Sequence, residues 1–278
     1  MAWWSRDGRD RGAARRPGQE DVAALAGLNA DGVSHCAVGR AADAIPRFED
    51  ALEGCRVALG DDHSHTLTVA GNLAAACVAA GQWRRGLDLM ATNLADRVRV
   101  FGEDDPRTLT AADAMASAYR LTGDVNEAVT LSGRVTAERR RILGPTHPDT
   151  LVSRMGMALA RAAAGDIESA LTLIEVALLD SEHAHGTRFQ HTIALRANAA
   201  ACLAALGRPE EAVAEFRRAV DDSAALLGAN HPDTVALHED MLMAQGEPAG
   251  AAQEGVPRNA ASNSDSMSAN RAEVISST

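Results

Sequence analysis

Histidine and carboxylate side chains gather in one stretch of this sequence. The segment DSEHAHGTRFQHT, residues 180–192, places His183, His185 and His191 close to Asp180 and Glu182. Histidine nitrogens and carboxylate oxygens are ligands of Zn²⁺ in catalytic sites. A metal-dependent or biosynthetic enzyme that uses this loop is therefore one hypothesis for the chain.

A structural role is the favoured interpretation of these histidines. A His-x-His pair usually needs a strand to place both imidazoles on one metal ion. Here the pair falls at a helix end that enters a loop, and His191 lies in the first turn of the next helix. His63 and His65 form a similar pair in a corresponding loop. We therefore expect no catalytic residue, no metal site and no cofactor.

The remaining composition narrows the classes of function further. All 27 basic residues are arginine, so a lysine Schiff base and a P-loop are excluded. The net charge of −11 disfavours a nucleic-acid partner. The sequence contains no run of about 18 apolar residues, so we expect no transmembrane helix. Four scattered cysteines without metal-binding spacing are typical of a reducing cytoplasm, where we expect the protein to act.

The elements that position these side chains repeat with a period of 42 residues. Several independent residue series share this period, which is the signature of a solenoid. One glycine series is Gly60, Gly102, Gly144, Gly186 and Gly228, and another is Gly39, Gly81, Gly123, Gly165 and Gly207. A threonine series is Thr66, Thr108, Thr150, Thr192 and Thr234, and a series of small residues is Ala44, Gly86, Ala128, Ala170 and Ala212.

Each period predicts two helices. The first, helix A, begins in a loop such as LGPTHPDTL, residues 143–151, and ends at the second glycine series. The second, helix B, runs to the next loop. Proline lies in the first turn of three A helices, where its missing N–H costs nothing. We expect the N-caps of the A helices to be Asp62, Asp104, Thr146, Arg188 and Asn230.

The 42-residue unit resembles the tetratricopeptide repeat of the kinesin light chain type. The features that carry the resemblance are the LGxxHPDT loop, the GNLA sequence at residues 71–74 and the small pair Ala74/Gly86 with its equivalents. It implies an all-α, right-handed superhelical solenoid of antiparallel helix pairs. Residues 18–245 would hold about five repeats and a capping helix. Residues 1–17 and 246–278 are expected to be disordered, because they contain few large apolar residues.

The resemblance also implies a binding mode. In this family the A helices line a concave groove that holds a peptide segment of a partner, and an asparagine binds the backbone of that peptide. This position is occupied by Asn72 and Asn198 here, but by Ala114 and Gly156 in the two repeats between them. The complete set of expected groove residues is Asn72, Asp113, Ser117, Arg120, Met155, Leu159, Asn198 and Glu239.

The sequence therefore favours an adaptor or regulatory module that binds a protein or peptide of unknown identity. We expect no membrane partner, and homo-oligomers are possible. One alternative is a peptide-sensing subunit that works with a separate effector. The enzyme that uses His183, His185 and His191 is a more remote alternative. Arg154, Arg161 and Arg196 occupy positions that usually hold apolar packing residues in the family that the chain resembles. The sequence leaves open whether they reach the groove or pair with acids across helices.

Overall fold

Eleven helices follow one another in the part of the chain that the computed structural model describes, residues 19–246. The segments predicted to be disordered, residues 1–17 and 246–278, lie outside this range except for Gly246. The helices are α1 (Gln19–Ala37), α2 (Ala41–Leu59), α3 (Ser64–Ala79), α4 (Trp83–Phe101), α5 (Pro106–Thr122), α6 (Val125–Leu143), α7 (Pro148–Ala163), α8 (Ile167–His185), α9 (Gln190–Ala205), α10 (Pro209–Leu227) and α11 (Pro232–Ala244).

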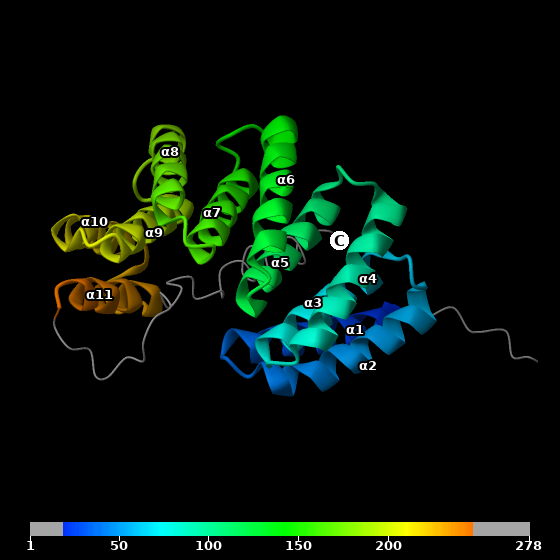
Figure 1. Cartoon of the computed structure of the whole chain (residues 1–278). Helices are drawn as coiled ribbons and strands as arrows, with labels where there is room; N and C mark the ends of the chain where they lie inside the picture. Colours follow the sequence, from blue (N-terminus) through cyan, green and yellow to red (C-terminus); the bar gives the residue numbers. More distant parts are fainter. Residues whose placement is uncertain (1–18, 247–278) are drawn as a thin grey trace, which may run out of the picture.

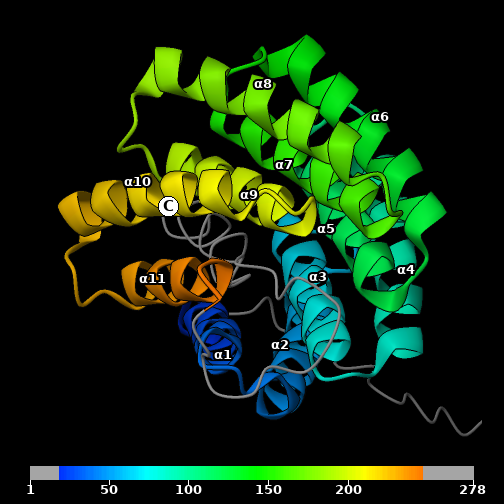
Figure 2. The ribbon, with the colours of Figure 1, turned by 60° about the vertical axis from the view of Figure 1, so that its left-hand side comes forward.

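Consecutive helices pack against each other along the whole array (Figure 1). The odd-numbered helices are the predicted A helices and the even-numbered ones the B helices. Among the described residues, α1, α3, α5 and α7 each also contact the next odd-numbered helix. No pair of even-numbered helices has comparable contacts in this range. The odd-numbered helices thus form the tighter, inner layer of an arc, as Figure 2 shows for α7 and α9 inside α6 and α8. We call their exposed surface the inner face.

The predicted glycine punctuation is confirmed. Every glycine of the two long series has a positive φ, as at Gly123, where α5 ends with the left-handed conformation and φ of 89°. Only glycine adopts this conformation without strain. From Gly39 to Gly228 a positive-φ glycine recurs every 21 residues, and each one follows the end of a helix.

The predicted N-caps of the odd-numbered helices are wrong by one residue. The caps are His63, Asp105, His147, Phe189 and His231, each one position after the predicted residue. In each histidine cap, Nδ1 accepts the N–H of the residue two positions later, at 3.2 to 3.3 Å. A neutral imidazole nitrogen can thus take the place of the usual cap oxygen. The histidine of HPDT, His147 before α7 and His231 before α11, therefore braces the start of its helix.

Small residues allow the two helices of each repeat to approach closely. Ala74, Ala158, Ala170 and Ala212 are fully buried at these contacts. The largest cluster of buried residues lies between α7 and α10 and includes Leu151, Ile174 and Leu195. With so few aromatic residues in the chain, this alanine-rich packing is the core of the array.

Candidate functional site

The inner face is built on a contact that recurs from repeat to repeat. Asn72 on α3 donates from Nδ2 to Asn29 Oδ1 on α1 at 2.9 Å. Asn198 on α9 donates from Nδ2 to Met155 Sδ on α7 at 3.3 Å. Each contact joins residues 43 apart in sequence. Each asparagine of the expected clamp therefore faces a fixed position on the preceding odd-numbered helix.

These contacts reduce the number of hydrogen-bonding groups that the two asparagines can offer a ligand. Asn198 is buried and also donates to the Ala194 carbonyl at 2.8 Å, so both of its N–H groups have acceptors. Asn72 is half-buried and retains one N–H and its Oδ1. The prediction that both residues hold a peptide backbone stays a prediction, and Asn72 is the better placed of the two.

Asp113 belongs to a buried ion-pair network rather than to an open surface. Its Oδ2 lies 3.0 Å from Nη1 of Arg139 on α6 and accepts from Ser153 Oγ on α7 at 3.2 Å. Arg139 also donates to the Asp149 carbonyl at 2.9 Å and to Thr110 Oγ1 at 3.0 Å. Burial raises the pKa of Asp113, and Arg139 and Ser153 oppose that rise. This network ties α5, α6 and α7 together.

Arg120, also on α5, differs from Asp113 in having no such partners among the described residues. It is half-buried, and in the described part of the chain it makes neither a hydrogen bond nor an ion pair. Burial lowers its pKa and no neighbouring charge contributes. Ser117 lies one turn earlier on the same helix and is also half-buried. Arg120 is thus a cation held partly out of water, with no anion from residues 19–246 beside it.

The middle of the inner face is apolar. Met155 and Leu159 on α7 are half-buried, as is Ala201 on α9. The short side chains on α9 leave its backbone close to the surface, and methionine adapts to several shapes. This section could contact the backbone or small side chains of an extended segment.

A carboxylate pair lies at the end of the array. Glu239 on α11 is exposed, and Asp240 is half-buried. Burial raises the pKa of Asp240 to about 6, and the charge of Glu239 adds to the rise. The sequence interpretation named Glu239 but missed Asp240. The signal was available, because Asp240 follows Asn198 by one period of 42 residues and so occupies the clamp position.

Three arginines whose role the sequence left open pair with acids across helices. Arg154 Nη1 lies 2.7 Å from Asp180 Oδ2 on α8, and Arg161 Nη1 lies 3.4 Å from Oδ2 of Asp166, the N-cap residue of α8. Arg196 is ion-paired with both Glu182 on α8 and Glu215 on α10. These arginines connect helices and are not the charged groups of a groove.

The histidine-rich loop is not assembled as a metal site. His185 Nε2 lies 2.7 Å from the Thr146 carbonyl oxygen, and its ring is 4.5 Å from that of Phe189, which in turn is 5.0 Å from the ring of His191. His183 is exposed. Across residues 19–246 no three His, Cys, Asp or Glu side chains are grouped so as to hold a metal ion. The loop braces two repeats.

A hollow of about 650 Å³ lies between α2, α3 and α4. Its charged groups already neutralise one another. Arg56 lies 3.2 Å from Asp61, and Arg99 lies 2.5 Å from Asp62 and 3.0 Å from Asp96. Unlike the inner face, this hollow therefore presents no charge without a partner.

None of the helices in the described range is long and apolar enough to cross a membrane.

Comparison with known proteins identifies the class to which this helical array belongs. A tetratricopeptide repeat family model matches residues 27–85, 67–137 and 114–178, and a second tetratricopeptide repeat model matches residues 192–233. The chain belongs to the tetratricopeptide repeat family. The resemblance predicted from the 42-residue period is confirmed.

Solved structures of kinesin light chain type share the fold. A kinesin light chain protein of Podosopora anserina with nearly identical TPR-like repeats is 23% identical, with a TM-score of 0.61, over 74% of this chain and 98% of that one. BtubC (BKLC) from P. vanneervenii is 14% identical, with a TM-score of 0.59, over 89% of this chain and 99% of that one. No curated protein sequence matches the chain. At these identities the likeness concerns the fold.

Proposed function

We propose that this protein is a non-catalytic adaptor that binds a peptide segment of a partner protein along its inner face. Tetratricopeptide repeat arrays support protein–protein interaction in general, and the binding surface proposed here is specific to this chain. The proposal also places the protein in the cytoplasm, which is consistent with four free cysteines at Cys36, Cys55, Cys77 and Cys202.

One observation carries the proposal. Three of the buried arginines between the helices, Arg139, Arg154 and Arg196, have acidic partners. The fourth, Arg97, donates to Asn93 and to two backbone carbonyl oxygens. On the inner face, Arg120 and Asp240 are half-buried and have no partner in the described part of the chain. Partly burying a charge without a partner costs free energy, so these two positions indicate contacts that a ligand completes.

A peptide-library selection on the purified protein tests the proposal. In Ala201→Arg, a long side chain would block the apolar section of the inner face, and captured peptides should be lost. Val176→Arg on α8 is the matched control, because Val176 is 50% exposed on an even-numbered helix and the charge change is identical. Circular dichroism would show whether both variants remain folded. Equal loss in both variants, or loss in neither, would count against the inner face.

A further inference from the structure

The charges without partners on the inner face have opposite signs and lie on different helices. The cation, Arg120, is on α5, and the anions, Asp240 and Glu239, are on α11. Two helices of the inner layer, α7 and α9, separate them. A ligand that neutralises both ends must therefore carry an acidic group and a basic group that are well apart.

The recurring contact of the inner layer explains why Asp240 has no partner. Asn72 and Asn198 each contact the residue 43 positions earlier, Asn29 and Met155. For Asp240 that residue is Ala197, whose side chain offers no hydrogen-bond donor and is itself buried. The neighbouring charge is Glu239, which repels the carboxylate. Only a group from outside the described chain can supply the missing cation.

Arg120 likewise lacks a partner of opposite charge among the described residues. Arg97 on α4 is also a buried arginine without a carboxylate partner, but it donates to Asn93 Oδ1 at 3.0 Å and to the carbonyl oxygens of Leu67 and Arg107 at 3.1 and 3.0 Å. Arg120 has no such acceptors among the described residues. A guanidinium in this state matches a carboxylate in a bidentate geometry.

The distance between the two poles limits the length of the ligand. Packed helices lie about 8–10 Å apart, so three steps from α5 to α11 span about 25–30 Å. An extended chain covers about 3.3–3.6 Å per residue, so about seven to nine residues bridge the poles. The surface between them is formed by Met155, Leu159 and Ala201, which suits small or apolar side chains.

We propose that the inner face from α5 to α11 binds an extended segment of seven to nine residues with an acidic group at Arg120, a basic group at Glu239 and Asp240, and small or apolar residues between. The proposal rests on the proposed function and specifies its ligand. Charge complementarity at both ends gives the segment a fixed register, because a shift of one repeat would leave both charges without partners.

Fluorescence anisotropy with synthetic peptides tests this chemistry. The probe is a labelled octapeptide with glutamate first, arginine eighth, and alanine and leucine between, together with the same sequence reversed. Two further probes replace either the glutamate or the arginine by glutamine. We expect one of the two directions to bind, and each replacement to weaken its binding about tenfold.

Variants of the protein assign each end of the probe. Arg120→Gln should remove the preference for glutamate, and Asp240→Asn should remove the preference for arginine. The exposed residues Arg140 and Asp221 are the controls, as Arg140→Gln and Asp221→Asn, which make the same charge changes on even-numbered helices. Asp240→Asn should bind the probe less tightly while the protein becomes more stable, a combination that loss of a merely structural residue does not produce.

The outcomes separate this inference from the proposed function. If the library yields peptides that depend on Ala201 but neither octapeptide binds, the bipolar ligand is wrong and inner-face binding stands. If an octapeptide binds equally well to Ala201→Arg, it binds elsewhere and both proposals are overturned. If the two charge variants behave like their controls, the assigned poles are wrong.

Discussion

At the scale of single residues, successive repeats hold an equivalent arginine in different ways. Arg97 and Arg139 are 42 residues apart and both are buried. Arg139 pairs with Asp113, whereas the residue equivalent to Asp113 in the preceding repeat is Gly71. There Asn93 replaces the acid, because its Oδ1 accepts from Arg97 and its Nδ2 donates to the Leu67 carbonyl at 2.8 Å. One repeat therefore holds its arginine by an ion pair, and the other holds it by hydrogen bonds to neutral acceptors.

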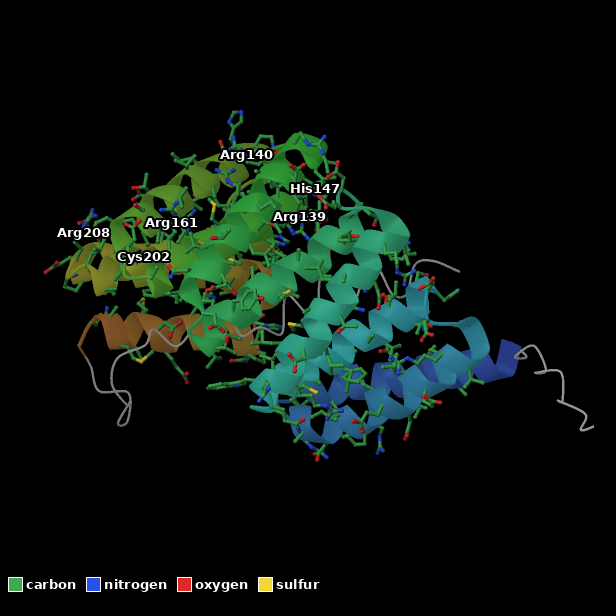
Figure 3. The ribbon with its side chains drawn as sticks, turned by 45° about the vertical axis from the view of Figure 1, so that its right-hand side comes forward. Arg139, Arg140, His147, Arg161, Cys202 and Arg208 are labelled. Atoms are coloured by element: carbon green, nitrogen blue, oxygen red, sulfur yellow. The ribbon has the colours of Figure 1, made fainter. Side chains whose placement is uncertain are left out.

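Removing one partner of the ion pair should be costly. We expect Arg139→Ala to lower the free energy of unfolding by about 3–5 kcal/mol, because Asp113 is left buried without its cation. Arg140→Ala on the same turn should change it by less than about 0.5 kcal/mol, since Arg140 is exposed (Figure 3). Urea unfolding measures both, and similar values for the two variants would contradict the ion-pair assignment.

The carboxyl of Asp240 should make stability depend on pH. Its pKa is about 6 in the folded chain against 3.8 as the ordinary value, so folding favours the protonated form. The stabilisation is complete below about pH 4 and is lost as the pH rises through 6. Asp240→Asn should therefore be more stable than the parent by roughly 1 kcal/mol at pH 7, after allowance for screening at a half-exposed group. At pH 3.5 the two melting temperatures should coincide, and a constant difference across this range would exclude the assigned titration.

At the scale of helices, the small-residue series contains an unusual member. Gly86 stands where Ala44, Ala128, Ala170 and Ala212 stand in other repeats. A Cβ at Gly86 would lie 2.5 Å from Val78 Cγ2 and 2.9 Å from the Val78 backbone nitrogen. The helices α3 and α4 are thus packed too closely for the alanine that the series favours.

The consensus substitution Gly86→Ala should destabilise the protein. Alanine is about 1 kcal/mol better than glycine in a helix interior, but here α3 and α4 would have to separate, at a cost of about 1–3 kcal/mol. Gly133→Ala on α6 is the matched control, since a Cβ there meets nothing within 4 Å. Thermal unfolding should show a lower melting temperature for the first variant and a higher one for the second. A rise in both would mean that the close approach of α3 and α4 is not required.

The helix boundaries could be predicted from sequence because each depends on local residues, glycine at one end and a cap or proline at the other. The caps themselves could not, because general preferences favour Asp62 over His63, and the imidazole acts as a cap only in this loop geometry. The site was harder still. Asp113 and Arg120 have similar positions in the pattern, and only the packing of α6 shows that Asp113 is neutralised and Arg120 is not.

At the scale of the whole molecule, stability is distributed unevenly along the array. In a repeat array each element contacts only its neighbours, so an end helix is held on one side. Ten residues of α9 are buried, whereas only three residues of α11 are. The helix α9 also contributes to the largest cluster of buried residues. The helix that carries Asp240 and Glu239 is therefore less firmly packed than the middle of the array.

Hydrogen exchange should show this gradient and relate it to binding. We expect amides of α11 to exchange before those of α9, because local opening requires less free energy where fewer apolar contacts are lost. Mass spectrometry of the intact chain, digested after labelling, measures this order. A saturating octapeptide that binds across α5 and α11 should slow exchange in α11 most, since it adds the missing neighbour. Exchange of all helices in a single cooperative step would show that the array does not open from its end, and the ligand would then protect every helix equally.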